Sequence, residues 1–437
     1  MGTSMEQNPR KKTGMNYGVK GWLLVLYACL AWLFIGGGWW ATAQNTMAGI
    51  KAEHLGVGRA DILAFNSYCG YVSVFVILGI GVLMAKYKTR IMQSVIMIVG
   101  GIAVCFYGSV RTVATYLIVF LFLDIMANAV SSVTLPQTII QWFPTKKGSA
   151  LGWATVGIQL SSLITLAVLN WLIGRWNAQV ATIIFGIATI IMGLINWFFI
   201  YDDPRRAGFE PDNGDFTAEE MEAHDKLMAG PECWTNKEAL RNKNFWLISL
   251  SYGINYMAST GLISQMVPYQ ISMGMEPAAA VRIMMLCPVL AFPGSVISGW
   301  IDQKIGTRRC GMLMSGFYVL AALCGGFLPY NVVTNWIFIL VFFWWTGATG
   351  NLPMSHAASC FGPRDYAHVY GRMAFIINVL RVTSPLILSI GLRYFSGFRF
   401  AYKIYCIASL CALIMLFFSD NRVDKEPGKK PTAAYKV

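Results

Sequence analysis

Charged residues are scarce in this sequence of 437 residues. Asp, Glu, Lys and Arg together make up 13% of the chain, whereas a soluble protein typically has about 25%. Hydrophobic residues reach 56% and aromatic residues 14%, which is more apolar than a soluble fold requires. The composition therefore excludes an ordinary soluble protein and predicts that most of the chain lies in a lipid bilayer.

Residue types that typically build enzyme and metal sites are also rare. The chain has only 4 His, in separate places, and contains neither an HExxH sequence nor a nucleophile elbow. Most of its 10 Cys fall in apolar runs, and no C-x-x-C pair occurs. We therefore expect no enzyme activity, no metal site, no disulfide framework and no cofactor.

Apolar runs long enough to cross a bilayer recur along almost the whole chain. A transmembrane helix needs about 20 apolar residues, and twelve such runs can be separated in the sequence. They are 21–44, 62–85, 91–110, 113–141, 149–173, 178–200, 245–271, 279–301, 310–328, 333–360, 372–392 and 400–419. The sequence thus predicts an all-α integral membrane protein with twelve transmembrane helices.

The basic residues predict how these helices are oriented. If the N-terminus is cytoplasmic, most of the 34 Lys and Arg residues fall in cytoplasmic tails and loops, as the positive-inside rule requires. We expect a multi-pass protein of the cell membrane with both termini in the cytoplasm. The net charge of +13 then belongs to loops that face anionic lipid, and it implies no nucleic-acid partner.

One loop sequence occurs twice, about half the chain apart. GVLMAKYKTR (81–90) aligns with GWIDQKIGTR (299–308). A second pair of sequences repeats Leu-Pro, as TLPQ from Thr134 and NLPM from Asn351. The two repeats predict an internal duplication, in which two six-helix halves are related by pseudo-symmetry about an axis along the membrane normal.

A polar segment midway along the chain separates the two predicted halves. Residues 201–244 are rich in acidic and basic side chains and include a capping-box pattern that begins at Thr217. The resulting division is a cytoplasmic tail (1–20), an N-terminal six-helix bundle (21–200), a cytoplasmic linker (201–244), a C-terminal six-helix bundle (245–419) and a second cytoplasmic tail (420–437).

Several polar segments resemble a known family. They are WFPTKKGSALG (142–152), DDPRRAGFEPDNG (202–214), WTNKEALRNKNFW (234–246) and FGPRDYAHVYG (361–371). With the repeated loops, they make the chain similar to the major facilitator superfamily, and most similar to its oxalate/formate antiporter and monocarboxylate transporter group. This resemblance implies the major facilitator fold and a secondary active transporter of a small organic anion. It also implies alternating access, by proton symport or anion exchange.

The repeated loops depart from the superfamily signature. That signature has an acidic residue four positions after the first Gly, where this chain has Ala85 and Gln303, and Asp302 is displaced by one position. The acid helps to lock one conformation in the family, so we expect the gate here to be held differently. The candidate gating residues are Gly81, Lys86, Arg90, Gly299, Asp302, Lys304 and Arg308, and the alternative role of their basic members is to set topology.

Two ionisable residues fall in the middle of predicted spans, where a charge costs about 2.5 to 3.5 kcal/mol on insertion scales. They are Asp124 in the fourth span and Arg381 in the eleventh. Arg381 is a candidate clamp for a substrate carboxylate, because a guanidinium stays charged and offers forked donors. Asp124 is a candidate proton site, and the alternative is a structural ion pair between the two.

Other polar residues accompany these charges at helical spacing. Asn128 lies one turn after Asp124, and Asn378 lies three residues before Arg381. Aromatic and amide residues of the first and seventh spans are candidates for a ligand wall, with anchoring at the membrane interface as the alternative; they are Trp39, Trp40, Gln44, Asn45, Gln265 and Tyr269. His356 is a second candidate for proton coupling, and a structural hydrogen bond to backbone is its alternative.

A single central cation favours a monocarboxylate as the substrate. The group resemblance implies basic residues in both the eighth and the eleventh spans for a dianion, and here only the eleventh carries one. The 15 Trp residues leave a bulkier aromatic or steroidal acid as an alternative, and a transporter-like receptor is another. The expected partners are the substrate anion, protons or a counter-anion, and the lipid bilayer. We expect a monomer.

Overall fold

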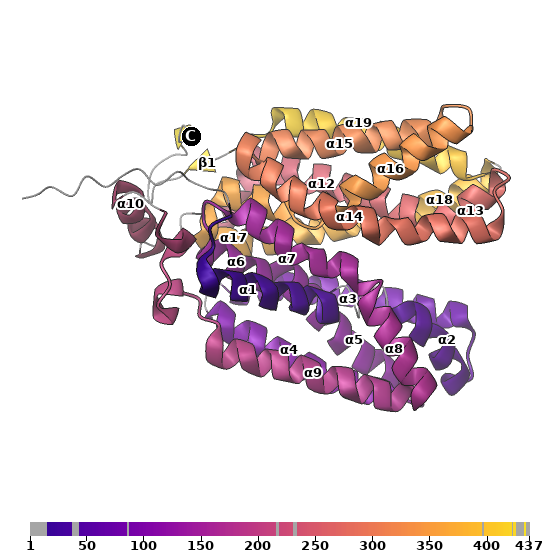
Figure 1. Cartoon of the computed structure of the whole chain (residues 1–437), viewed down its shortest axis with the longest axis horizontal. Helices are drawn as coiled ribbons and strands as arrows, with labels where there is room; N and C mark the ends of the chain where they lie inside the picture. The colour runs from indigo at the N-terminus through magenta and orange to yellow at the C-terminus, as the bar shows by residue number, and fades with distance from the viewer. Residues whose placement is uncertain are drawn as a thin grey trace, which may run out of the picture.

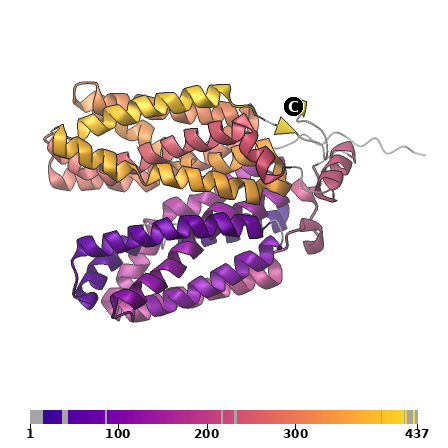
Figure 2. The ribbon, with the colours of Figure 1, turned by 180° about the vertical axis from the view of Figure 1, so that it is seen from behind.

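A computed structural model describes residues 15–36, 43–84, 87–215, 218–229, 234–395, 397–421, 423–424 and 432–433. Figures 1 and 2 show two groups of long helices lying side by side, the first built from the N-terminal half of the chain and the second from the C-terminal half. Within the described residues, the only strands are the short pair β1 (Val423–Asp424) and β2 (Thr432–Ala433), which are antiparallel. The protein is therefore all-α, as predicted.

The N-terminal half consists of helices separated by short turns. They are α1 (Gly18–Ala31), the π-helical turn η1 (Trp32–Gly36), α2 (Ala43–Leu55), α3 (Arg59–Leu83), α4 (Thr89–Tyr107), α5 (Val113–Ala129), the π-helical turn η3 (Val130–Thr134), α6 (Leu135–Trp142), α7 (Lys147–Ser161), α8 (Ile164–Arg175) and α9 (Ala178–Phe199).

The linker contains the 3-10 turns η4 (Pro204–Ala207) and η5 (Pro211–Gly214), followed by α10 (Ala218–Ala229) and α11 (Asn236–Arg241). The C-terminal half consists of α12 (Lys243–Ser264), α13 (Met266–Ser272), α14 (Pro277–Ile305), α15 (Thr307–Gly326), α16 (Val332–Thr349), α17 (Leu352–Arg381), α18 (Ser384–Tyr394) and α19 (Phe398–Phe418). Gly362, at φ 81°, interrupts α17 and marks the predicted loop between the tenth and eleventh spans.

Membrane-spanning character varies among these helices. In the part of the chain that the structure describes, ten helices are long and apolar enough to cross a bilayer. The predicted seventh and eleventh spans are helical as well, as α12 with α13 and as α17 with α18, but their sequences are more polar. Because a polar helix is stable in a membrane only where it faces protein or water, these two spans are expected to face the interior.

The linker and the described part of the C-terminal tail lie at the same end of the bundles. Figure 1 shows α10 and β1 at one end, whereas α2, α13 and α18 lie at the other. We call the first the linker end and the second the opposite end. The two halves meet where α3 packs on α17 and where α7 packs on α14. These two crossings position the candidate site.

Candidate functional site

The two mid-span charges lie near each other, and each belongs to a different half. Asp124 lies on α5 of the N-terminal half and is 5% exposed. Arg381 lies at the end of α17 in the C-terminal half and is partly exposed. An electrostatic interaction connects the two side chains. The structure thus brings together residues that are 257 positions apart in the sequence, and each half supplies one charge.

Asp124 is held in place by polar groups of its own half. The hydroxyl of Ser73, on α3, donates a short hydrogen bond to the Asp124 carboxylate. The Asn128 side chain donates to the Asp124 backbone oxygen at 2.9 Å. Ser73 is fully buried, and its hydroxyl also lies 2.9 Å from the Gly70 backbone oxygen of its own helix, so both of its partners are protein groups. The carboxylate is therefore fixed between α3 and α5, pointing into the protein.

Arg381 is surrounded by polar and aromatic groups of the C-terminal half. Tyr256, on α12, lies near Arg381. Asn378, one turn earlier, donates its amide to the Ala374 backbone oxygen at 2.8 Å, which repeats the bond that Asn128 makes on α5. Arg381 as a whole residue is partly exposed, although it lies in the middle of a predicted span.

The helix that carries Asp124 is distorted just after it. The turn η3 has π-helical hydrogen bonding and leads into Leu135-Pro136 at the start of α6. Proline cannot donate the regular helical hydrogen bond and clashes with the preceding turn, so the helix widens there. Such widened turns are frequent at functional sites. In the other half, α16 ends and α17 begins at Asn351, before Leu352-Pro353. The repeated Leu-Pro sequences therefore both mark a helix interruption.

At the first crossing, α3 and α17 come together through glycine. A Cβ added to Gly81 would lie 3.2 Å from the Gly371 Cα and 3.3 Å from the Ala367 backbone oxygen. Nearer the middle of the two helices, the rings of Phe75 and Phe375 are 5.3 Å apart. The crossing is therefore a close backbone contact followed by an aromatic pair, and no charged group takes part in these contacts.

At the second crossing, α7 and α14 are closer and more polar. A Cβ added to Gly299 would lie 2.4 Å from the Gly148 backbone oxygen and 3.0 Å from the Gly152 Cα. The Ser295 hydroxyl donates to the Gly152 backbone oxygen at 2.9 Å and shares a second 2.9 Å hydrogen bond with Thr155. The two halves are therefore hydrogen-bonded to each other at this crossing.

Asp302, the displaced acid, belongs to the second crossing. It is 4% exposed and accepts a hydrogen bond from Ser355 at 2.5 Å. Its carboxylate lies so close to Gly148 that a Cβ there would be 2.2 Å from Oδ2, and it interacts electrostatically with Lys147. Both residues are at the N-terminus of α7, where the helix dipole favours a negative charge. Displaced as it is, Asp302 still reaches across to the other half.

The repeated arginines hold loops within their own halves. Arg90 donates its guanidinium to the Trp197 backbone oxygen near the end of α9. In the matching position, Arg308 donates to the Phe417 backbone oxygen near the end of α19. The backbone N–H of Arg90 donates to Asp202, while that of Arg308 donates to Asn421. These bonds are pseudo-symmetric and cap helix ends; none of them joins the two halves.

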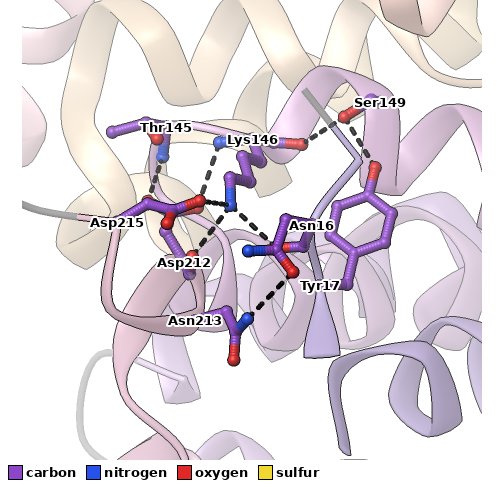
Figure 3. A network of polar contacts seen from close by, with 8 residues as sticks. All are labelled: Asn16, Tyr17, Thr145, Lys146, Ser149, Asp212, Asn213 and Asp215. Atoms are coloured by element: carbon purple, nitrogen blue, oxygen red, sulfur yellow. Dashed lines mark hydrogen bonds and ion pairs between the residues drawn. The ribbon is translucent and has the colours of Figure 1, made fainter. Parts of the chain in front are cut away.

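The first part of the linker is bound to the N-terminal half by the residues drawn in Figure 3, which we call the linker clasp: Asn16, Tyr17, Thr145, Lys146, Ser149, Asp212, Asn213 and Asp215. The Asp212 carboxylate accepts backbone N–H groups from Thr145 at 2.9 Å and Lys146 at 3.2 Å. The Lys146 ammonium donates to the backbone oxygens of Asn16 and Asp212 and forms an ion pair with Asp215. Burial raises the pKa of Asp212, against the opposing effect of these N–H groups.

The end of the linker is bound to the C-terminal half with the opposite polarity. Here the acid belongs to the bundle, because Asp365 accepts the backbone N–H of Trp234 at 3.0 Å. His368 bonds the Trp234 backbone oxygen at 2.9 Å, and the Trp234 ring packs edge-on against Phe361 at 5.3 Å. The two ends of the linker are therefore each fixed to a different half.

Other predicted site residues lie away from the central charges. Tyr269 is inside the C-terminal half, where its hydroxyl donates to the Gly325 backbone oxygen at 2.8 Å and its ring packs on Tyr402 at 4.6 Å. His356 is fully buried and bonds both the Tyr252 hydroxyl, at 3.3 Å, and the Asp420 backbone oxygen, at 3.0 Å. These contacts favour packing for Tyr269 and the structural alternative for His356.

The remaining predictions fall at helix ends or outside the described residues. Gln265 is partly exposed at the junction of α12 and α13, and Lys304 lies over the Trp300 ring at 3.7 Å. Gln44 and Asn45 belong to α2, which is separate from the first span, and their side chains are not among those described. Trp39, Trp40 and Lys86 lie outside the described residues.

Sequence reasoning did not identify Ser73, which bonds Asp124, or the linker clasp at the linker end. Ser73 had no signal of its own, since a lone Ser in an apolar run is common. The clasp depends on two successive residues with positive φ, Asp212 at 53° and Asn213 at 60°, and their Asp-Asn-Gly sequence is typical of that conformation.

Comparison with known proteins identifies the family. Residues 28–360 match the Major Facilitator Superfamily. The human organic anion transporter MFSD10 (TETRAN) superposes with a TM-score of 0.63 at 12% identity, over 91% of this chain and 97% of that one. A variant of the E. coli fucose:proton symporter FucP gives 0.66 at 11% identity, over 91% and 98%. FucP in the outward conformation gives 0.65 at 11% identity, over 92% and 99%.

At these identities, the solved structures establish the likeness of the fold alone. No curated protein sequence matches the chain. The family match covers most of the chain and agrees with the helical membrane architecture and with the duplicated halves. This chain therefore belongs to the Major Facilitator Superfamily, and it is a multi-pass secondary transporter rather than an enzyme.

Proposed function

We propose that this transporter carries a small monocarboxylate together with a proton, and that Arg381 binds the carboxylate while Asp124 takes up the proton. The observation that supports the proposal most is the interaction of Asp124 with Arg381 across the two halves. An organic anion is also the class named for MFSD10, and proton coupling is named for FucP. Those similarities are distant and serve only as support.

The charge balance of the site favours a substrate with one negative charge. In the absence of substrate, the positive charge of Arg381 is opposed by the negative charge of Asp124. A carboxylate that binds the guanidinium takes over this role, since two parallel hydrogen bonds fit its geometry. A dianion would leave one of its charges without a cation, which is costly in a low-dielectric site.

The same balance explains why a proton is needed. When the substrate occupies Arg381, the Asp124 carboxylate loses its counter-charge while staying buried beside Ser73. A buried carboxylate without a partner is neutralised by protonation rather than kept as an ion. One anion and one proton then move together, and the site passes between the two faces of the membrane without net charge.

Alternating access requires that one end of the molecule be closed. Both close crossings use the linker-end portions of α3, α7, α14 and α17. We take the linker end as cytoplasmic, in line with the distribution of basic residues, so this structure represents a transporter closed toward the cytoplasm. Transport then consists of opening these crossings while the halves approach at the opposite end.

Uptake into proteoliposomes tests this function. Purified protein is given a panel of labelled short and aromatic acids, with and without an inward proton gradient. We expect accumulation of a monocarboxylate that depends on the gradient. Asp124→Asn, which resembles the protonated residue, is expected to lose this accumulation and to keep exchange of labelled for unlabelled substrate at equal pH.

Asp61→Asn is the matched control, because Asp61 is an exposed carboxylate at the start of α3, the helix that also carries Ser73. Normal gradient-driven accumulation by Asp124→Asn would overturn the assignment of the proton site and favour anion exchange. Accumulation of aromatic acids alone would favour the bulkier substrate class. Vesicles that take up nothing from the panel would favour a receptor.

A further inference from the structure

A groove runs along the outer side of the C-terminal half, away from the central charges. Figures 1 and 2 show α15 and α19 on the side of this half that faces away from the N-terminal half. The groove measures about 580 Å³, and ligand sites commonly measure about 300 to 1,000 Å³. We call it the α15 groove, and its lining includes Arg309, Met312, Leu313, Phe317 and Leu320 of α15 and Leu413 of α19.

The α15 groove is apolar along its length and charged at one end. Its lining residues on α15 follow Arg309 at three, four, eight and eleven positions, which places them on one face of the helix. Leu313 is 41% exposed and Leu320 is 38% exposed. Arg309 is exposed and is the one charged residue in the described lining. The groove therefore offers an open apolar face with a single cation at its end.

The charge of Arg309 is available, whereas the neighbouring cations are engaged. Arg308 donates to the Phe417 backbone oxygen, and Lys304 lies over the Trp300 ring at 3.7 Å. Among the residues that the structure describes, none forms a hydrogen bond or an ion pair with the Arg309 side chain. A ligand with a negative charge at one end would therefore complement the groove.

The length of the α15 groove matches one leaflet of a bilayer. Arg309 lies in the first turn of α15, at the linker end, and Leu320 is eleven residues further along the helix. At a rise of 1.5 Å per residue the two are separated by about 16 Å, which is about half of the hydrocarbon core. The groove thus spans one leaflet, and Arg309 lies at the depth of the lipid headgroups.

We propose that the α15 groove binds an anionic phospholipid of the linker-end leaflet, with its phosphate on Arg309 and one acyl chain along the apolar face. The forked donors of a guanidinium fit a phosphate, and basic residues at the membrane surface favour anionic lipids. The first turn of α15 adds the positive end of a helix dipole. A second copy of the chain, with its net charge of +13, is a poorer match for an unpaired cation.

The test compares two lipids that differ in headgroup charge. Phosphatidylglycerol and phosphatidylcholine with identical acyl chains are titrated into the purified full chain, and native mass spectrometry measures occupancy of the tightest site. We expect the wild type to bind phosphatidylglycerol about 5-fold more tightly, which is the effect of one cation near a membrane surface. In Arg309→Gln the ratio should fall to about 1. Arg282→Gln removes an exposed cation near the start of α14 and should keep the wild-type ratio.

A second variant tests the apolar face. Leu313→Gln should weaken binding of both lipids to a similar extent and keep their ratio, because it removes contact with the acyl chain and leaves Arg309 in place. Ile187→Gln changes a residue of α9 that is 50% exposed in the other half, and it should keep the wild-type affinity for both lipids. Wild-type affinity in Leu313→Gln would show that no acyl chain lies in the groove.

Three further outcomes would overturn the proposal. The first is equal affinity of the wild type for the two lipids, and the second is a preference for phosphatidylglycerol that persists in Arg309→Gln. Displacement of the lipid by inorganic phosphate would assign Arg309 to a free anion instead. A wild-type dimer that dissociates in Leu313→Gln would assign the groove to a second copy of the chain. None of these results depends on Arg381 or Asp124, so the proposed transport function is tested separately.

Discussion

The two halves of the transporter share their framework and differ in their charges. Arg90 and Arg308 close matching loops onto the last turns of α9 and α19, and Leu-Pro interrupts a helix in each half. The mid-span charges have no such match, because Asp124 lies in the fourth span of one half and Arg381 in the fifth span of the other. The two halves thus share the contacts that hold their helices together, while each half contributes a different charged residue to the site.

The two crossings between the halves also share a backbone feature and differ in their polar contacts. Gly81 and Gly299 occupy equivalent positions and both allow close approach, but α14 adds hydrogen bonds and an acid at its own crossing. Around Gly81, the hydrogen bonds between the halves come from neighbouring elements, where Gln137 of α6 donates to the Pro363 backbone oxygen at 2.8 Å. A backbone contact alone brings helices together, whereas hydrogen bonds and charges specify one arrangement of them. The crossing at Gly81 therefore allows the two helices to approach closely, whereas the crossing at Gly299 also stabilises the closed arrangement of the two halves.

Removing the unmatched cation has the largest expected effect. Arg381→Ala should weaken binding of the substrate acid by at least about 100-fold, since a charge-assisted bidentate bond is lost. Arg381→Lys should recover only part of the affinity. Binding is measured by calorimetry on purified protein, with Arg308→Ala as a control that removes a cation at the end of the same half. Wild-type affinity in Arg381→Ala would contradict the prediction.

The two repeated glycines should tolerate a methyl group unequally. A Cβ at Gly299 meets backbone at 2.4 Å, whereas a Cβ at Gly81 meets it at 3.2 Å. We expect Gly299→Ala to destabilise the closed linker end by about 1 to 3 kcal/mol, as overpacking does, and Gly81→Ala to cost less. Gly316→Ala is the matched control, because nothing lies within 4 Å of its added Cβ.

The effect of these glycine variants is measured as the distance distribution between spin labels on the two sides of the linker end. Gly299→Ala should shift the population toward open distances, Gly81→Ala less so, and Gly316→Ala not at all. If Gly81→Ala opened the linker end more than Gly299→Ala, the conclusion that the crossing at Gly299 stabilises the closed arrangement would be wrong.

The repeated arginines should behave alike. Arg90→Lys loses two guanidinium hydrogen bonds to the Trp197 backbone oxygen, and Arg308→Lys loses one to the Phe417 backbone oxygen. Each change should lower the free energy of unfolding by about 1 kcal/mol. Because the two arginines share no partner, the double variant should show nearly the sum of the single effects. Thermal unfolding in detergent checks this, and a strongly non-additive double variant would show that the loops are coupled across the halves.

The linker clasp should give the smallest effect, seen in its pH dependence. Folding raises the pKa of Asp212 above its usual 3.8 through burial. The stabilising contribution of protonated Asp212 is therefore fully present below pH 3.8, and it is lost as the pH rises through the raised pKa. Asp212→Asn should flatten this part of the melting-temperature profile, with a change of a few degrees. Asp225→Asn, in the exposed part of α10, should keep the wild-type slope, and an unchanged slope in Asp212→Asn would refute the prediction.

The fold could be predicted from the sequence because its main signals are local. Runs of apolar residues specify membrane helices one at a time, and the repeated loops reveal the duplication without any knowledge of contacts. The mid-span charges were visible for the same reason, since Asp124 and Arg381 are conspicuous in apolar surroundings. Their interaction across the halves stayed an open alternative, because it depends on how two helices far apart in the sequence are rotated.

The rest of the site depends on such rotations. Tyr269 was predicted to line a ligand wall because it lies in the seventh span, the repeat counterpart of the first. In the structure Tyr269 faces the interior of its own half. Asp212 also needed the fold, because its partners Thr145 and Lys146 are more than 60 residues away and are backbone groups.

The contact of Gly81 with Gly371 has a consequence for the rate of the transport cycle. Helices that interlock through side chains must lift those side chains out of grooves before they can tilt. Two glycines present smooth backbone, so α3 and α17 can roll over each other with few rotamers to rearrange. We therefore expect the glycine contact itself to add little to the kinetic barrier of opening, and the hydrogen-bonded contact between α7 and α14, which has to break when the linker end opens, to add more.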